Sequence, residues 1–151
     1  MKGRFELKFK RSYLLIGLIA LFVFIQLIPV DRENPSSNPE SELKAPQEVM
    51  TLLKNSCYDC HSNQTNWPIY SYIAPVSWLV ARDVKKGRHD LNFSEWGKLS
   101  SEKKYKVRKE MVEETSEGNM PLPIYLLMHS EAELSDEQKM KLNEWADSTI
   151  D

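Results

Sequence analysis

The segment NSCYDCHSNQTNWP, residues 55–68, contains both cysteines of the 151-residue chain and one of its three histidines. Cys57 and Cys60 are separated by two residues and His61 follows directly, so the motif is C-x-x-C-H. Two thiols and an imidazole can act as nucleophiles, as a redox pair or as metal ligands, and their surroundings decide which property is used. The formal charge of the chain is only -2, so its composition gives no reason to expect a nucleic-acid partner.

Four interpretations of the motif compete. C-x-x-C-H is the attachment signal for c-type haem, in which the two thiols add to the haem vinyl groups and the adjacent imidazole reaches the iron. A thiol-disulfide oxidoreductase is disfavoured because no βαβ pattern surrounds the motif. A structural zinc site needs four ligands, and no second cysteine pair follows. A disulfide that closes so short a loop would stabilise little. The motif therefore favours one covalently bound haem c, with Cys57 and Cys60 as attachment points and His61 as the proximal ligand.

The N-terminal part of the sequence has the pattern of a membrane anchor. Residues 12–30 (SYLLIGLIALFVFIQLIPV) carry no charge and are long enough to cross a hydrocarbon core of roughly 30 Å. Residues 1–11 are rich in lysine and arginine, which would hold this end in the cytoplasm. Residues 31–46, with three prolines and few apolar residues, are expected to form a flexible or extended linker. This pattern predicts a single-pass protein of the inner (cytoplasmic) membrane with residues 47–151 on the periplasmic, extracytoplasmic side.

The rest of the chain has helical periodicity throughout, and no stretch alternates convincingly as a strand. A short helix begins near Pro46 and ends at Cys57, and a second runs from Ala74 to Lys86 with Gly87 placed to end it. A third is capped by Ser100 or Ser101 and stops at Gly118. The segment 135–138 (SDEQ) fits the capping box of a final helix. The predicted fold class is therefore all-α.

Several motifs, in this order, carry a resemblance to a known family. They are CYDCHSN (57–63), WP (67–68), IAPVSW (73–78), LNFSEW (91–96) and MPLP (120–123). Together they resemble the membrane-anchored bacterial haem-binding domain family, which is similar to monohaem c-type cytochromes. The resemblance covers about two thirds of the chain and implies a small cytochrome c-like helical domain, tethered here to one N-terminal transmembrane helix, with haem attachment and a location in the cell envelope.

Met120 is the candidate for the second axial ligand. It lies in GNMPLP (118–123), where a glycine and two prolines favour an irregular loop that can direct a thioether inward. The resemblance to cytochromes c implies that Met120 is the distal ligand. His89, His129 and an open or water-bound position remain the alternatives, although His89 is expected in a polar turn after the second helix.

Ligation separates two classes of function. With His61 and Met120 both bound, the iron has no position for a substrate, and the expected function is electron transfer to or from a redox partner protein rather than enzymatic catalysis. An open distal position would instead suit a haem-based peroxidase or a sensor of small gases. Whether the chain is an enzyme is left open by the sequence.

Overall fold

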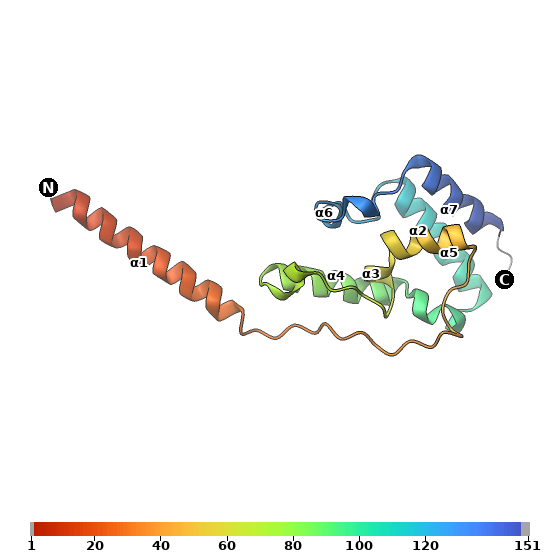
Figure 1. Ribbon diagram of the computed structural model, residues 1–151, viewed down its shortest axis with the longest axis horizontal. Helices are drawn as coiled ribbons and strands as arrows, with labels where there is room; N and C mark the ends of the chain where they lie inside the picture. Colours follow the sequence, from red (N-terminus) through yellow and green to blue (C-terminus); the bar gives the residue numbers. More distant parts are fainter. Residues whose placement is uncertain (1, 149–151) are drawn as a thin grey trace. The chain divides into compact units, whose positions relative to one another are not determined.

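The computed structural model describes residues 2–148, with side chains from residue 10 onward. Every regular element in these residues is helical, and none of them is in a β-strand, which confirms the predicted all-α class. By contact the chain divides into two compact units, residues 1–32 with 67–82, and residues 33–66 with 83–151. In chain order, the elements (Figure 1) are α1 (Lys2–Ile25), α2 (Gln47–Ser56), α3 (Tyr58–His61), η1 (Ile69–Tyr72), α4 (Val76–Asp90), η2 (Phe93–Lys98), α5 (Ser101–Ser116), α6 (Pro123–Leu126), η3 (Ser130–Ala132) and α7 (Asp136–Ser148).

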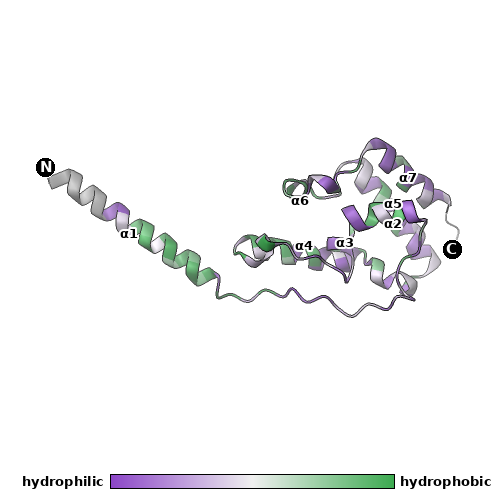
Figure 2. Cartoon of the chain, in the orientation of Figure 1, coloured by the Kyte–Doolittle hydropathy of each residue, from purple (hydrophilic) through white to green (hydrophobic). Residues whose placement is uncertain are grey.

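The prediction of a transmembrane anchor over residues 12–30 is wrong. Within the described part of the chain, no helix combines the length and apolar character required to cross a membrane. Helix α1 ends at Ile25, and residues 26–30 form turns and extended backbone. Its uncharged helical part, Ser12–Ile25, is therefore about 21 Å long at 1.5 Å per residue, shorter than a hydrocarbon core of roughly 30 Å. Figure 2 shows this apolar stretch in green.

The predicted localisation is also wrong, because it depended on the membrane anchor. A single-pass arrangement in the inner membrane, with a cytoplasmic N-terminus and an extracytoplasmic haem domain, required a spanning helix, and the structure does not contain one among the residues it describes. The end of α1 is instead held by polar contacts in its own unit. The Gln26 side chain donates to the Ala74 carbonyl at 3.2 Å and accepts from the Ala74 N–H at 2.9 Å. Arg32 donates to the Ser71 carbonyl at 3.2 Å and lies over the Tyr72 ring.

The second unit contains the hydrophobic core. Helix α5 packs against α7, and α2 packs against α3, α7 and η3. Fully or nearly fully buried side chains from these elements, from the segment before α2 and from η2 form one cluster: Leu43, Val49, Leu53, Tyr58, Phe93, Trp96, Val107, Leu134, Leu142, Trp145 and Ala146. Burial of apolar surface of this kind contributes about 25 cal/mol per Å², so this cluster is the main source of the unit's stability.

Helix α5 begins and ends as its sequence predicts. The Ser100 hydroxyl accepts a hydrogen bond from the Lys103 N–H at 3.3 Å. At the other end, Gly118 has a φ of 77°. The N–H of Gly118 donates to the Thr115 carbonyl at 3.3 Å, and that of Asn119 donates to the Glu114 carbonyl at 2.9 Å. This is a Schellman motif, which satisfies the last carbonyls of the helix and needs the left-handed conformation that glycine adopts most easily.

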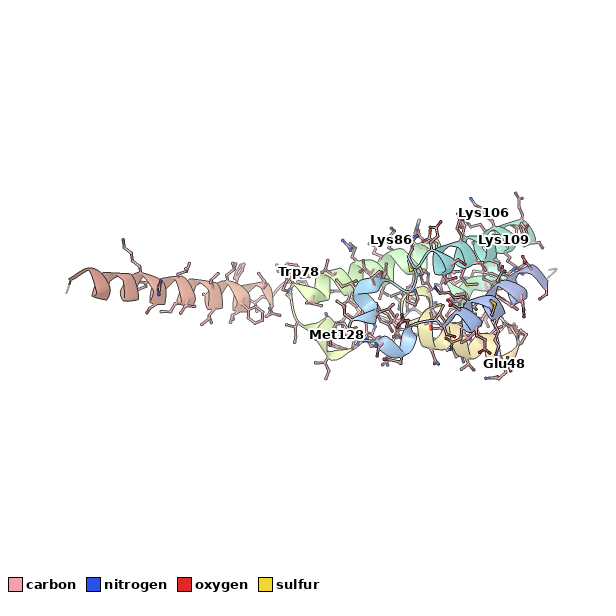
Figure 3. The ribbon with its side chains drawn as sticks, turned by 90° about the horizontal axis from the view of Figure 1, so that it is seen from above. Glu48, Trp78, Lys86, Lys106, Lys109 and Met128 are labelled. Carbon is pink, nitrogen blue, oxygen red and sulfur yellow. The ribbon has the colours of Figure 1, made fainter. Side chains whose placement is uncertain are left out.

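Helix α7 carries the predicted capping box. The Ser135 N–H donates to Oε1 of Gln138 at 2.8 Å, and the Gln138 N–H donates to the Ser135 hydroxyl at 3.3 Å. Lys106 and Lys109 extend from α5 (Figure 3). Lys106 pairs with Glu110 of the same helix at 3.5 Å, and Lys109 pairs with Asp147 of α7. These exposed pairs contribute little to stability, but they neutralise part of the basic run 101–109.

The prediction that Gly87 ends the second helix is wrong, because α4 continues through Gly87 to Asp90. Glycine is needed at position 87 for a different reason. A Cβ atom built on it would lie 2.6 Å from the carbonyl oxygen of Cys60, which is closer than Cβ atoms approach other atoms in proteins. Glycine therefore allows α4 to approach the backbone of the C-x-x-C-H turn, and His89 lies in the last turn of the helix rather than after it.

Residues 31–38 have no regular secondary structure, and the segment 33–43 is bonded to other parts of the second unit at several points. Arg88 of α4 donates to the Glu33 carbonyl at 3.0 Å, to Oδ1 of Asn34 at 2.7 Å, to the Ser62 carbonyl at 2.8 Å and to the Thr65 hydroxyl at 2.8 Å. Further along, the Leu43 N–H donates to the Phe93 carbonyl at 2.9 Å, and the Leu43 side chain is buried. This segment therefore lies along the turn that follows His61.

Candidate functional site

A cavity of about 680 Å³ lies in the second unit. Its volume is within the 300–1,000 Å³ that is usual for small-molecule and cofactor sites. The ends of α2 and α3, the end of α4, the inner side of α5 and the loop after α5 supply its walls: Ser56, Cys57, His61, Lys86, His89, Asp90, Leu91, Phe93, Lys103, Val107, Glu110, Met111, Glu113, Glu114, Thr115, Met120 and Pro121. Three of the four predicted site residues, Cys57, His61 and Met120, therefore face one space.

A short helical turn arranges the C-x-x-C-H motif. Cys57 ends α2, with its N–H bonded to the Leu53 carbonyl at 2.9 Å, and its own carbonyl accepts from the N–H groups of Cys60 at 3.2 Å and His61 at 2.9 Å. Residues four apart share a helix face, which explains why Cys57 and His61 line the cavity together. Cys60 is not among the lining residues and packs against Gly87 of α4.

The two cysteines are free thiols and are not joined by a disulfide. Burial raises the pKa of Cys57 to about 12, with a smaller contribution from Cys60. Burial, followed by the nearby carboxylates of Asp59 and Asp83, raises the pKa of Cys60 to about 12. A redox-active C-x-x-C pair needs a lowered thiol pKa, so this environment disfavours the oxidoreductase interpretation. Among the residues described, no group of three or more His, Cys, Asp or Glu side chains is arranged to hold a metal ion, which disfavours the zinc site.

The His61 ring is oriented from two sides. Its Nδ1 lies 3.1 Å from the Leu91 carbonyl oxygen, and because a carbonyl can only accept, Nδ1 carries the proton. The lone pair of the neutral ring is then on Nε2, which is the form that ligates a metal. Phe93 packs edge-on against the ring, with 6.3 Å between centroids. Burial lowers the pKa of His61, and this also favours the neutral ring.

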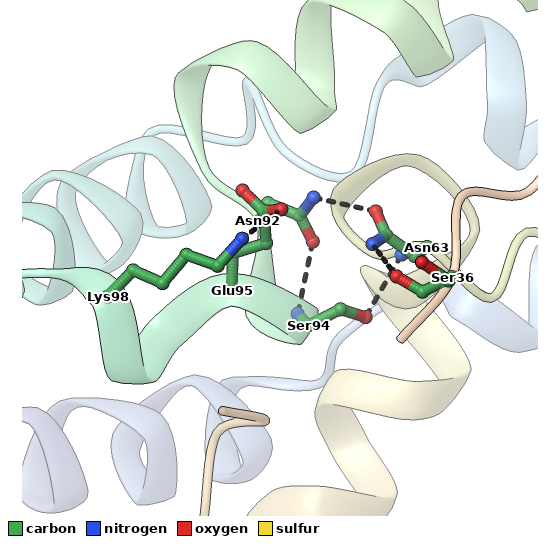
Figure 4. Close-up of polar contacts among 6 residues, drawn as sticks. All are labelled: Ser36, Asn63, Asn92, Ser94, Glu95 and Lys98. Atoms are coloured by element: carbon green, nitrogen blue, oxygen red, sulfur yellow. Dashed lines mark hydrogen bonds and ion pairs between the residues drawn. The ribbon is translucent and has the colours of Figure 1, made fainter. Parts of the chain in front are cut away.

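A polar network holds the segment that orients His61. The Asn92 side chain donates to Oδ1 of Asn63 at 2.8 Å and accepts from the Ser94 N–H at 3.0 Å, which caps η2 (Figure 4). The Ser94 hydroxyl accepts from the Asn63 N–H at 3.0 Å, and the Asn63 side chain donates to the Ser36 carbonyl at 3.2 Å. Asn63 and Ser94 are buried, so these bonds are made away from water. They fix the turn after His61 against the loop that carries Leu91 and Phe93.

The Schellman motif at the end of α5 determines where Met120 lies. After Gly118 reverses the backbone direction, the Met120 N–H donates to the Glu114 carbonyl at 3.1 Å, and the half-buried side chain lines the cavity. The other candidate ligands differ. The His89 side chain is 86% exposed and bonded to Asp90. His129 does not line the cavity and stacks on Tyr125. Met111 lines it but also packs against the core, and Met128 is exposed.

Two contributions to the site were not predicted from the sequence. Tyr58 is buried, stacks on Phe93 with 5.2 Å between ring centroids, and donates its hydroxyl to Glu42 at 3.1 Å. Asp59 accepts a hydrogen bond from the Tyr125 hydroxyl at 2.8 Å. They are the two x residues of C-x-x-C-H, and only the aromatic side chain of Tyr58 gave a sign of a specific role, because aspartate is common in turns.

The residues around the cavity fit a haem. Leu91, Phe93, Val107 and Met111 supply an apolar wall for a large flat ring, and His61 supplies an imidazole that lines the same cavity. These features are those expected of a haem-binding site. Residues 20–148 match the model of the haem-binding domain family, and the chain belongs to that family. No curated protein and no solved structure matches it.

Proposed function

We propose that this protein carries one haem c, bound covalently through Cys57 and Cys60, and that it transfers electrons. The observation that supports the proposal most directly is that Cys57, His61 and Met120 line the same cavity. Each thioether would form by addition of a cysteine S–H across a vinyl C=C bond. No atom is lost in this addition and no oxidant is required, so protonated thiols such as Cys57 and Cys60 are suitable reactants.

The protein's side chains have distinct roles in this proposal. Leu91 and Phe93 hold the His61 ring, and its Nε2 would then be available to bind the haem iron. Met120, in the loop after α5, would supply a thioether as the second ligand. A haem bound in this way would supply a one-electron redox centre whose potential is raised by the methionine ligand. Two ligands from the protein would leave no position on the iron for a substrate, which favours outer-sphere electron transfer over catalysis.

A redox partner protein follows from the same proposal, because an electron-transfer protein needs a donor and an acceptor. Lys86 and Lys103, which are basic, and Glu113 and Glu114, which are acidic, all line the cavity and are exposed. The cavity therefore presents both charge signs, and its charge does not select an acidic or a basic partner.

The test is to produce the protein in cells that mature c-type cytochromes and to denature it in the presence of a strong acid or detergent. We expect the polypeptide to keep the mass of one haem and to stain for haem on a gel, and we expect the Cys57→Ala, Cys60→Ala double variant to lose both properties. A wild-type protein that releases all its haem on denaturation would overturn covalent attachment.

The alternative, a peroxidase or gas sensor with an open distal position, makes the opposite prediction for ligand binding. His89, Glu110, Glu113 and Glu114 line the cavity and include the kinds of acid-base group that a peroxidase uses. The reduced protein should bind carbon monoxide readily if the distal position is open, and slowly or not at all if Met120 occupies it.

A further inference from the structure

Outside the set of proposed ligands, one hydrogen bond joins two parts of the site that are far apart in sequence. The Tyr125 hydroxyl donates to Oδ2 of Asp59 at 2.8 Å across 66 residues. Asp59 lies between the two cysteines of C-x-x-C-H, and Tyr125 lies in α6, five residues after Met120. The bond therefore connects the turn that carries the attachment cysteines to the segment that follows the distal candidate.

Asp59 is held rigidly at its end of the bond. Its Oδ1 accepts from the Asn66 N–H at 3.0 Å, and its backbone carbonyl accepts from the Thr65 hydroxyl at 2.7 Å. The carboxylate thus has a fixed direction before Tyr125 is added. Because the Asp59 side chain is already ordered, its hydrogen bond to Tyr125 costs little further conformational entropy.

Tyr125 is also oriented. Its ring stacks on the His129 ring with 4.3 Å between centroids and 12° between planes, and Nδ1 of His129 lies 3.0 Å from Oε1 of Glu131. The Tyr125 N–H bonds to the Leu122 carbonyl at 2.9 Å, and its carbonyl accepts from the His129 N–H at 3.1 Å. Both the backbone and the ring of Tyr125 are therefore held in place, and the hydroxyl is directed toward Asp59.

The chain between Met120 and Tyr125 transmits this restraint. Pro121 and Pro123 fix two of the intervening φ angles, so few backbone rotations separate the thioether from the tyrosine. On the other side, the Met120 N–H is bonded to the Glu114 carbonyl of α5. The Met120 loop therefore has two attachment points, one on α5 and one on Asp59.

We propose that Tyr125 is a positioning residue whose hydrogen bond to Asp59 fastens the Met120 loop to the haem-attachment turn and so keeps the Met120 sulfur at the iron. This inference rests on the proposed function, because it needs Met120 as the distal ligand. Without the bond, the loop would lose its direct connection to Asp59, and the methionine would leave the iron more often.

The test uses the ferric holoprotein and imidazole, which binds iron only when the methionine has dissociated. Tyr125→Phe removes the hydroxyl and keeps the ring. We expect imidazole to bind this variant about tenfold faster than the wild type, because a hydrogen bond to a charged group no longer opposes opening; tenfold corresponds to about 1.4 kcal/mol. Tyr105→Phe is the matched control, since Tyr105 is exposed and does not line the cavity, and its rate should equal that of the wild type.

Asp59→Asn provides a second variant that keeps a neutral acceptor. Its binding rate should lie between those of the wild type and Tyr125→Phe, and the double variant should bind no faster than Tyr125→Phe, because both changes act on one bond. The inference would be overturned if the rate increases of the two single variants multiplied in the double variant, or if Tyr125→Phe bound imidazole at the wild-type rate.

Failure of the proposed function gives a different result. If the wild-type ferric spectrum lacks the sulfur-to-iron charge-transfer band of methionine ligation, both proposals fail together. If the band is present and Tyr125→Phe binds imidazole at the wild-type rate, only the role of Tyr125 is refuted.

Discussion

Gly87 of α4 lies so close to Cys60 that a Cβ atom there would be 2.6 Å from the Cys60 carbonyl oxygen and 3.2 Å from the Cys60 Cβ. The obstacle is backbone, which cannot move aside as the end of a flexible side chain would. The packing of α4 on the C-x-x-C-H turn therefore depends on the absence of a side chain at this position.

Gly87→Ala should lower the free energy of unfolding. Alanine stabilises a helix interior by about 1 kcal/mol relative to glycine, but overpacking costs about 1–3 kcal/mol, and here the contact is with backbone. The net expectation is a loss of about 1 kcal/mol, measured as a lower midpoint in urea unfolding. Gly17→Ala in α1 is the control, since its Cβ would have no neighbour within 4 Å and should not destabilise the protein. A stabilised Gly87→Ala variant would contradict the close approach.

Asn92→Asp tests the network that holds the loop beside His61. The new carboxylate can still accept from the Ser94 N–H, but it replaces a donor with an acceptor facing Oδ1 of Asn63. The buried Asn63 oxygen then lacks its donor, and we expect a loss of about 1–3 kcal/mol in unfolding free energy. Since the Leu91 carbonyl orients His61, the haem spectrum should also change.

Glu95→Gln is the control for this prediction, because Glu95 belongs to the same segment but its pair with Lys98 is exposed (Figure 4). An exposed pair contributes less than about 1 kcal/mol, so stability and spectrum should be nearly those of the wild type. Equal effects of the two variants would show that the network has no special importance.

The thiol environment predicts slow alkylation of the haem-free, reduced protein. With the pKa of Cys57 and of Cys60 raised to about 12, very little thiolate exists near pH 8, and the thiolate is the species that reacts. Iodoacetamide should therefore modify the folded protein far more slowly than the urea-unfolded protein. Because the folded state favours the protonated thiols, its stability should decrease as the pH rises above the ordinary thiol value of 9.0 toward 12. Rapid alkylation of the folded protein near pH 7 would restore the oxidoreductase interpretation.

Met120→Ala should leave the haem attached while converting a low-spin, six-coordinate iron toward high spin. The reduction potential should decrease and carbon monoxide binding should become faster, because the thioether stabilises ferrous iron. Absorption spectra in both redox states and a redox titration measure these changes.

Two methionines serve as controls for that substitution. Met128 is 68% exposed, so Met128→Ala should change neither spectrum nor stability. Met111 packs against the core and also lines the cavity, so Met111→Ala should cost about 2–5 kcal/mol but keep the low-spin spectrum that methionine ligation gives. A wild-type spectrum in Met120→Ala, with an altered one in a His89 or His129 variant, would replace methionine by histidine as the ligand.

Local sequence signals predicted the helices well. Ser100, Gly118 and the Ser135–Gln138 capping box act through residues within one turn of themselves, and each marks the helix end it was expected to mark. The position of the C-x-x-C-H turn at the end of α2 likewise depends on residues that are close in sequence. Haem binding followed from this motif and is supported by the family to which the chain belongs.

Features that depend on distant contacts were not predictable. In the sequence, Gly87 resembles a glycine that ends a helix. Only its contact with the Cys60 backbone explains why glycine lies inside α4. The uncharged run 12–30 has the composition of a spanning helix, but its helical part ends at Ile25. Asp59 and Tyr125 give no sign in sequence that they meet. The roles of Cys57, Cys60, His61 and Met120 remain predictions that the experiments above address.

The hydrogen bonds made by residues 33–43 determine how many N-terminal residues can be removed from a fragment of this protein. A fragment starting at Pro46 would remove the backbone and side-chain oxygens of Glu33 and Asn34 to which the Arg88 guanidinium donates, and the Ser36 carbonyl that accepts from Asn63. It would also delete Leu43, which fills part of the core. A fragment intended for haem reconstitution or crystallisation should therefore begin at or before Glu33, because truncation closer to the cysteines would remove these hydrogen bonds and part of the core.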